Sequence, residues 1–484
     1  MNIRAFKSIV LFVSFVLVLT ACSKTDYIDV IPTNSTALLA VDPAGAGSSR
    51  GKALVGSLLF AVNADRSGID LSQRLYFFET ADGNLGVCAS VSSVADLTET
   101  FAKLEKAGRG KAVSERDGLH FSVLGGSWVA AFNDVALLVM GPVAVADQPQ
   151  VQNRLARYLQ QSEERSIRNT PMFAKLDSMT APMTLVAQAS ALPEKLALPL
   201  TLGAPRNADA SQVLLAAEMK VEKGALSVEG EVLSVEGEVF SFNKSIDRAL
   251  KEAAECYRPI RGRFLETMPS DAQSGLFLNV DGRRLLPLMQ GNAGMQALLA
   301  GVNAAIDMDN ILKSVDGDVA VVARNTHSQP SATQPSSSAS HHTFVAELAH
   351  SEWLADVGYW KQSSPKGSRI DDWGRNAYAF TDGNTSFCFG VASLPAAEKA
   401  SSDSSSSLLF YSGTTRDAAQ SSLQRAANPI SWQLKQRIQG QRLVLLANVG
   451  TLLPQDEGDG ALSSLAPFLR SLLGDVQTIV YNMK

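Results

Sequence analysis

Hydrophobic and polar positions alternate along much of the chain, and this alternation predicts β-strands. Six such runs are 119–124, 127–132, 135–140, 213–221, 319–324 and 442–448. Several of them are separated by only a few turn-forming residues, and short turns join antiparallel rather than parallel strands. The pattern therefore predicts mainly antiparallel sheets.

Helical periodicity falls between these groups of strands. Apolar residues recur at helical spacing in 94–107, 150–161 and 245–257. Strands and helices are mixed, without the regular strand-helix-strand alternation of a parallel sheet. The expected fold class is therefore α+β.

Two stretches of the chain resemble each other at a constant offset. Pro32 and Pro269 are 237 residues apart (269 − 32), and so are Ile69 and Ile306 (306 − 69). Several matches in the same order indicate a duplicated unit. We expect two related halves, each a mainly antiparallel sheet with packed helices.

The expected boundaries follow from this repeat. The first α+β repeat covers 31–243 and the second covers 268–484, with a connecting helix and linker at 244–267. Within the second repeat, 325–342 and 401–407 are rich in Ser, and such segments cannot support a core. We expect both to be loops between strands.

The N-terminus has the features of a bacterial lipoprotein signal. Arg4 and Lys7 precede an apolar run that is too short to span a bilayer, which is typical of a secretory signal. The run ends in the lipobox Leu-Thr-Ala-Cys, whose cysteine is Cys22. We expect residues 1–21 to be removed, Cys22 to be acylated as a membrane anchor, and 22–30 to form a tether. An ordinary signal peptide with an incidental cysteine is the alternative.

Composition supports a folded protein of the cell envelope. The 484 residues are 45% hydrophobic and 19% charged, which permits a sizeable core. Lys and Arg total 43 against 48 Asp and Glu, so a basic nucleic-acid surface is not expected. Ser23 rather than Asp follows the lipidated cysteine, which favours the outer membrane, and the scarcity of acidic residues beyond it favours the periplasmic face over the cell surface.

Several motifs carry a resemblance to a known family. They are the lipobox, the opening at 30–42, the step at 68–71, the segment 127–142 (SWVAAFNDVALLVMGP) and the segment 314–319. With these motifs the chain resembles a family of Bacteroidetes outer-membrane lipoproteins of unknown function. The resemblance implies an outer-membrane location and a duplicated α+β build, and it brings no catalytic residues to this chain.

One glycine-rich segment suggests a phosphate loop. Gly45, Gly47 and Gly51 precede Lys52, but the spacing is one residue too long for GxxxxGK. Residue 53 is Ala, where a magnesium-binding Ser or Thr belongs. A linker is the better interpretation, and we expect no nucleotide there.

Two residue pairs are the remaining candidates for chemistry. His341 and His342 could bind a transition metal, but neighbouring histidines in an expected loop lack fixed geometry. Asp42 and Asp281 end matching strands, where paired carboxylates could act as acid and base. An aspartate just before a helix more often caps it. We therefore expect no metal, no cofactor and no catalytic residue at these positions.

The chain is expected to be a non-enzymatic binding or scaffolding component of the cell envelope, because it has no recognisable nucleophile and base set. Its expected partners are the membrane, through the lipid on Cys22, and other envelope proteins. One alternative is an envelope hydrolase whose residues converge from distant segments. The other is a carrier of an apolar ligand in a cavity between sheet and helices.

Overall fold

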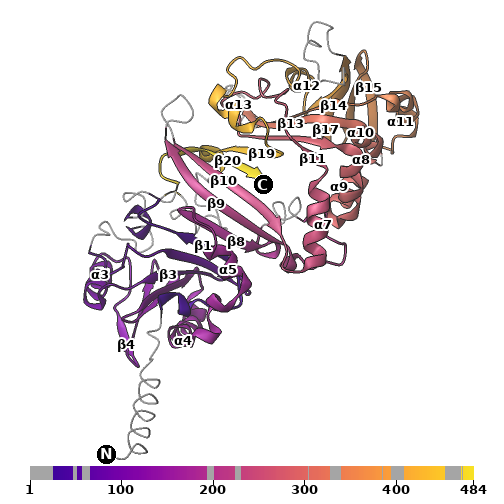
Figure 1. The fold of residues 1–484 in the computed structure, drawn as a ribbon. Helices are drawn as coiled ribbons and strands as arrows, with labels where there is room; N and C mark the ends of the chain where they lie inside the picture. Colours follow the sequence, from indigo (N-terminus) through magenta and orange to yellow (C-terminus); the bar gives the residue numbers. More distant parts are fainter. Residues whose placement is uncertain are drawn as a thin grey trace, which may run out of the picture. The chain divides into compact units, whose positions relative to one another are not determined.

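The computed structural model describes residues 26–46, 52–56, 66–192, 201–223, 231–303, 305–326, 339–383, 385–393, 408–452, 470 and 473–483. The chain divides into two compact units (Figure 1). Unit 1 consists of Met1–Ser35 and Asp65–Phe173, and unit 2 consists of Thr36–Ala64 and Ala174–Lys484. None of the helices in the described ranges is long and apolar enough to cross a membrane.

Unit 1 contains an antiparallel sheet in the order β2-β3-β7-β6-β5-β4. Its strands are β2 (Leu75–Thr80), β3 (Leu85–Ser90), β4 (Ser114–Arg116), β5 (Leu119–Leu124), β6 (Trp128–Phe132) and β7 (Ala136–Gly141). Short turns connect them, and Gly83 in the β2–β3 turn has a φ of 77°, a conformation that glycine adopts without steric cost.

Two amphipathic helices pack on this sheet, α3 (Val94–Lys106) and α4 (Gln148–Leu159). Phe101 of α3 stacks on Phe132 of β6 with ring centroids 5.2 Å apart, and Leu155 of α4 is fully buried. The short 3-10 helices of the unit are η1 (Tyr27–Val30), η2 (Val145–Asp147), η3 (Glu163–Arg165) and η4 (Ile167–Asn169). Helix α5 (Pro171–Asp177) follows them.

Unit 2 contains one continuous sheet in the order β1-β8-β9-β10-β20-β19-β12-β13-β14-β18-β17-β16-β15. Its strands in chain order are β1 (Ser35–Val41), β8 (Met183–Gln188), β9 (Leu214–Lys223), β10 (Glu231–Phe240), β12 (Ser274–Asp281), β13 (Val315–Thr326), β14 (Ala339–Leu348), β15 (Ser368–Gly374), β16 (Ala377–Asp382), β17 (Thr385–Ser393), β18 (Leu408–Gly413), β19 (Leu443–Asn448) and β20 (Val476–Met483). The short strand β11 (Tyr257–Arg258) pairs with the end of β12. Among the described pairs, only β10 with β20 is parallel.

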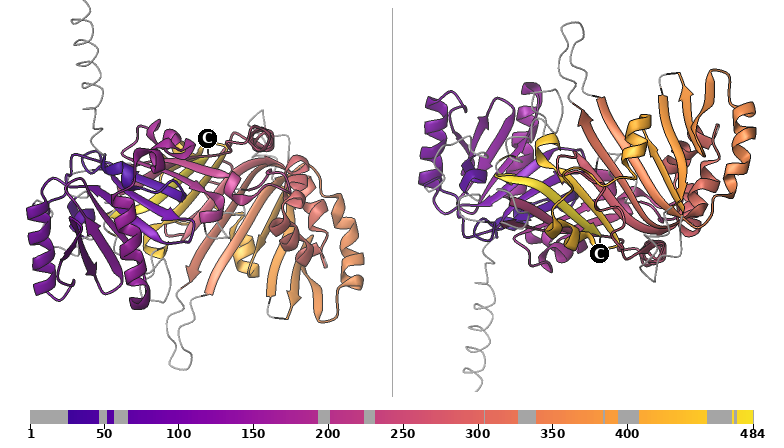
Figure 2. Two further views of the ribbon diagram at one scale, coloured as in Figure 1. Left: turned by 90° about the horizontal axis from the view of Figure 1, so that it is seen from below. Right: turned by 90° about the horizontal axis from the view of Figure 1, so that it is seen from above.

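Successive residues of β12 face two different cores of unit 2, because side chains alternate across a strand. Phe277 joins a cluster with Leu434 and Ile438 of α13. Val280 joins a second cluster, which contains Trp353 and the neighbouring helices. Figure 2 shows the strands of unit 2 with their helices from two further sides.

Within the described ranges, the helices of unit 2 include α7 (Lys244–Ala254), α8 (Gly282–Gly291), α9 (Ala293–Asn303), α10 (Met308–Ser314), α11 (Val357–Ser363), α12 (Arg416–Ser421), α13 (Trp432–Ile438) and α14 (Val449–Leu452). Its 3-10 helices are η5 (Ala189–Ala191), η6 (Ala210–Gln212) and η7 (Glu352–Asp356).

The α+β class predicted from the sequence is confirmed by this mixture of helices with mainly antiparallel strands. The six runs predicted as strands all lie on strands, and the three periodic segments coincide with α3, α4 and α7, except that the end of the third reaches Tyr257 of β11. One prediction is wrong in part: the expected loop at 325–342 is strand at both ends. Residues 325–326 and 339–342 extend β13 and β14, because cross-strand pairing continues from Ala323–His342 out to Thr326–Ala339. Residues 327–338 and 401–407 lie outside the described ranges.

Tyr481 lies across the parallel junction between β10 and β20. Its ring occupies the space above Gly237, where a Cβ atom would overlap it. Its hydroxyl is buried and has no hydrogen-bond partner among the described residues. Burial raises the pKa of Tyr481 to about 12.

Replacing Tyr481 by Phe should raise the free energy of unfolding by about 1 kcal/mol at pH 7, because it removes a buried unsatisfied hydroxyl. Between about pH 10 and pH 12 the unfolded chain releases a phenolic proton that the folded chain retains, so wild-type stability falls as the pH rises through this window. Urea denaturation at pH 7 and across pH 9–12 should show a smaller alkaline loss in Tyr481→Phe.

Burial also raises the pKa of the Cys256 thiol to about 11. Because this thiol is present in both the wild type and Tyr481→Phe, its effect on stability cancels when the two are compared. This account of Tyr481 would be contradicted if Tyr481→Phe were less stable than the wild type at pH 7 and lost as much stability as the wild type at alkaline pH.

Candidate functional site

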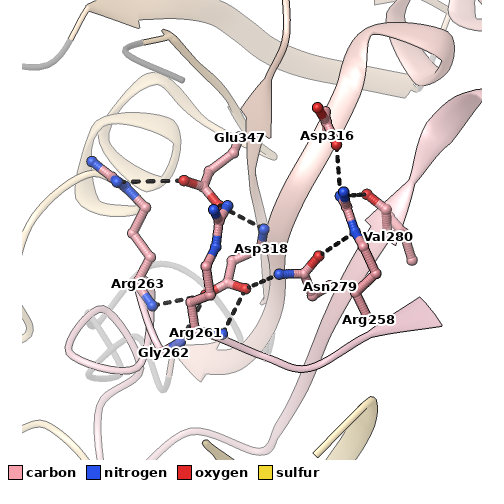
Figure 3. Close-up of polar contacts among 9 residues, drawn as sticks. All are labelled: Arg258, Arg261, Gly262, Arg263, Asn279, Val280, Asp316, Asp318 and Glu347. Carbon is pink, nitrogen blue, oxygen red and sulfur yellow. Dashed lines mark hydrogen bonds and ion pairs between the residues drawn. The ribbon is translucent and has the colours of Figure 1, made fainter. Parts of the chain in front are cut away.

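Asp318 is a buried carboxylate on β13 that organises a neighbouring segment (Figure 3). Only 2% of the residue is exposed, yet its carboxylate accepts four hydrogen bonds. Three come from the successive backbone N–H groups of residues 261–263, at 2.9, 2.7 and 2.9 Å. The fourth comes from Asn279 Nδ2 on β12, at 2.8 Å. These donors stabilise the charge of Asp318, which would otherwise be costly to bury.

Glu347 on β14 is a second buried carboxylate, 1% exposed, beside Asp318. It pairs with Arg261, and with Arg263 Nη1 at 3.3 Å. It also accepts the backbone N–H of Asp318 at 2.7 Å. At this place Val315 pairs with Leu348 and Val319 pairs with Ala346, so three residues of β13 bulge opposite Glu347. The carboxylate therefore satisfies a backbone donor that the bulge removes from the strand ladder.

Gly317 makes this bulge possible. Its φ is 146°, and a Cβ atom at this position would overlap the Glu347 carboxylate. A side chain here would therefore displace the acid from the bulge.

A third pair completes the network. Arg258 donates to Asp316 Oδ1 at 2.7 Å, to Asn279 Oδ1 at 3.0 Å and to the carbonyl oxygen of Val280 at 2.8 Å (Figure 3). Three arginines thus balance three carboxylates within the network. Because its charge is balanced and its buried acceptors are occupied, the network is suited to holding the segment 258–263 on the sheet rather than to binding an ion.

Replacing Asp318 by Asn should lower the free energy of unfolding by about 3 kcal/mol. An amide presents N–H donors to the backbone N–H groups that the carboxylate accepted, which leaves buried donors unpaired. The matched control is Asp316→Asn, two residues away on the same strand. Its side chain is 43% exposed, and its ion pair is expected to contribute about 0–1 kcal/mol. Equal losses in both variants, measured by chemical denaturation, would contradict the structural role of Asp318.

A charged pocket lies at the same end of β13, close to where that strand begins. Its volume is about 500 Å³, within the usual range for small-molecule sites. The residues lining it are Arg283 of α8, Asn310 and Lys313 of α10, His350 of the loop after β14, and Glu352, Trp353 and Asp356 of η7. It therefore gathers cationic and anionic side chains in one cavity.

His350 has an unusual environment in this pocket. Its Nδ1 atom is buried and makes no hydrogen bond to any described residue. The nearest carboxylate oxygen, Glu352 Oε2, is 4.0 Å away, beyond hydrogen-bond distance. A buried polar atom without a partner in the protein is uncommon, and a water molecule, an ion or a ligand in the pocket would supply the partner.

A second cavity of about 360 Å³ lies between residues 201–213 and 291–296. Three of its polar side chains already have partners in the protein. Arg206 donates to the carbonyl oxygens of Gln290 and Gly291, and Asn292 donates to Thr201. This cavity therefore has room for a small molecule but few polar side chains that do not already have a hydrogen-bond partner.

The structure separates the residue pairs singled out from the sequence. Asp281 caps α8 by accepting the Arg283 backbone N–H at 3.0 Å, and Asp42 accepts the Ala44 backbone N–H at 2.9 Å within a turn. Asp281 thus caps a helix as expected, whereas the expected helix cap is wrong for Asp42, which stabilises a turn at 43–46. Cys22 and residues 47–51 of the glycine-rich segment lie outside the described ranges.

The interpretation of His341 and His342 as loop residues is wrong, because both belong to β14 and pair with Arg324 and Ala323 of β13. Neighbouring strand residues point to opposite faces, so the two side chains cannot share one metal ion. His341 Nδ1 lies 3.0 Å from Thr414 Oγ1. No cluster of three metal-ligating side chains occurs in the described part of the chain.

Sequence reasoning missed Asp318, Glu347 and the charged pocket. The residues that contact one another in the network are 21 to 86 positions apart along the chain, so no short motif unites them. Two local signals were available: two aspartates flank Gly317 inside an apolar strand, and arginines occur at 258, 261 and 263. Either signal indicates buried or paired charge without identifying its partner.

Comparison with known proteins yields a family but no activity. The family described as "Domain of unknown function (DUF4836)" matches residues 59–382. No curated protein matches the chain. Among solved structures, crystal form I of TP0453 is 10% identical and covers 42% of this chain and 75% of its own, with a TM-score of 0.28. Crystal form III of TP0453 is 11% identical and covers 42% and 76%, also with a TM-score of 0.28. These scores do not establish a shared fold.

Proposed function

Because the chain belongs to the DUF4836 family, whose function is unknown, we propose a function from the chain's own residues: it is a lipid-anchored, non-enzymatic binding protein of the cell envelope. The charged pocket is the observation that carries the binding role. Its lining residues supply cations, carboxylates, an amide and an imidazole, which are recognition groups.

The anchoring part of the proposal rests on the lipobox that ends at Cys22. Several acyl chains on one cysteine, at about 0.8 kcal/mol for each buried CH₂ group, hold a protein stably on a membrane. The Ser at position 23 favours the outer membrane, with the folded chain on its periplasmic face. As in the family of Bacteroidetes lipoproteins that the sequence resembles, the anchor would keep the pocket within the envelope.

Cys22→Ala should abolish incorporation of a fatty-acid analogue and release the protein from the outer-membrane fraction, because the acylated thiol is lost. Labelling and membrane fractionation in the native host measure both effects. Cys88→Ala is the matched control, because this thiol is buried on β3 and should leave label and fractionation unchanged. Undiminished labelling of the Cys22 variant would rule out the anchor.

The proposal includes a duplicated build, in which residues 31–243 and 268–484 are related repeats. Corresponding strand pairs support it: β1 pairs with β8 as β12 pairs with β19, and β8 pairs with β9 as β19 pairs with β20. Likewise β3 pairs with β7 as β14 pairs with β18. The same pairings recur in the same chain order, as expected if one unit was copied.

An experimental structure should let these repeats superpose in sequential order over most of their strands, with Asp42 close to Asp281. The expectation follows from the conserved offset and from the matching strand pairs. Superposition that requires a different strand order, or that separates the two aspartates, would contradict the duplication.

One observation favours the carrier of an apolar ligand as a second candidate. A row of cross-strand neighbours on one sheet face of unit 2 is apolar: Val235, Tyr481, Leu445, Leu276, Val321 and Phe344. Leu445, near the middle of the row, is 38% exposed. Saturable binding of a fatty acid that Leu445→Gln weakens would favour the carrier over the charged pocket as the principal binding site.

A further inference from the structure

We propose that the charged pocket binds a zwitterion, a small molecule that carries both an ammonium group and a carboxylate or phosphate. This inference rests on the binding function proposed above and specifies the chemical class of its ligand. It follows from three features of the pocket: a cationic wall, an acidic wall, and contacts that hold the two walls in place.

The cationic wall consists of Arg283 at the start of α8 and Lys313 near the end of α10. Both side chains are exposed, and neither has an ion pair with another described residue. Their charges are therefore available to an anionic group in the pocket.

The two cations are brought together by a close contact between helices. A Cβ atom at Gly282 would overlap the carbonyl oxygen of Leu312, so only glycine lets α8 begin directly against the last turn of α10. Asn310 on the same wall is held by Asp307, whose Oδ2 accepts from Asn310 Nδ2 at 2.6 Å. The cationic wall is thus fixed by packing and capping.

The acidic wall consists of Glu352 and Asp356 on η7. The Glu352 side chain is 90% exposed, and its contact with His350 is a long 4.0 Å. Asp356 has no ion pair within the described ranges and makes no capping hydrogen bond to α11. Both carboxylates are available to a cationic group.

Trp353 ties the acidic wall to the cationic one. Its ring is 2% exposed, stacks on Trp360 with centroids 6.0 Å apart, and donates from Nε1 to Ser314 Oγ at 3.3 Å. Ser314 directly follows Lys313 at the end of α10. The hydrogen bond from Trp353 to Ser314 therefore connects η7, which carries the two carboxylates, to the helix that carries Lys313. A pocket held in this way loses little freedom on binding.

The charges decide the class of ligand. The two positive charges of Arg283 and Lys313 balance the two negative charges of Glu352 and Asp356. A simple anion in the pocket is therefore repelled by the carboxylates, and a simple cation is repelled by Arg283 and Lys313. A molecule with both charges matches both walls and is favoured over either. Free amino acids, short peptides and ethanolamine lipid headgroups all have this chemistry.

Calorimetry on the full chain in detergent, with glycylglycine as the probe, tests the proposal. Succinate and ethylenediamine are the controls, because each carries only one kind of charge. We expect saturable binding of glycylglycine that is at least tenfold tighter than binding of either control. Vesicles of phosphatidylethanolamine and of phosphatidylglycerol form the lipid arm, and retention on the first alone identifies a headgroup as the source.

Lys313→Ala and Asp356→Asn should each weaken binding of the favoured zwitterion at least tenfold. Arg284→Ala is the control variant: it removes a neighbouring exposed cation of α8 that does not line the pocket, and should change binding less than twofold. Binding of succinate as tight as that of glycylglycine would overturn the zwitterion class. So would the absence of binding to both glycylglycine and phosphatidylethanolamine.

These outcomes are separate from those of the function proposed above. Labelling of Cys22 reports the anchor whether or not the pocket binds a zwitterion. A protein that binds a fatty acid saturably, with weaker binding in Leu445→Gln, and that binds no zwitterion would still be a binding protein. That result would overturn only the inference about the charged pocket.

Discussion

The burial of two carboxylates beside a β-bulge is the constraint on which the arrangement of β13, β14 and the segment 258–263 depends. A buried carboxylate is tolerated only where donors surround it. Asp318 meets this condition by collecting three successive backbone N–H groups, and Glu347 meets it with two arginines and a bulge N–H. The chain segment that supplies these donors has little freedom to lie elsewhere.

The same constraint also affects the charged pocket, because the bulge and a residue that anchors the pocket wall both lie at the start of β13. The bulge places residues 316–318 opposite Glu347, and Ser314 lies immediately before the strand. Ser314 accepts from Trp353 with its hydroxyl and accepts the backbone N–H of Ala349 with its carbonyl oxygen. A shift in the register of β13 would therefore disturb both the network and the wall of the pocket that Trp353 anchors.

Local structure was predictable from the sequence because its causes are local. Strands followed from alternation over five or six residues, and helices followed from apolar spacing. Asp-Gly at 82–83 and at 382–383 is typical of a tight turn, and both glycines adopt the positive φ that such turns require. His341 and His342 were misplaced because the composition of 325–342 resembles a loop, whereas pairing with β13 extends the strand into it. Composition reports whether a segment can form a core, and says less about whether a neighbour continues its ladder.

The network and the pocket were not predictable in this way, because their residues meet only through the fold. Arg261 and Glu347 are 86 positions apart, and nothing near either residue specifies the other. The two sites nevertheless differ in a way that bears on function. In the network each buried carboxylate already accepts hydrogen bonds from the protein, so the charges of the network stabilise the fold and are not available to a ligand. In the pocket the cations lie on α8 and α10 and the carboxylates lie on η7, and among the described residues their closest approach to an opposite charge is the 4.0 Å between His350 Nδ1 and Glu352 Oε2. Charges that a fold holds apart in this way can recognise a molecule that carries the opposite arrangement.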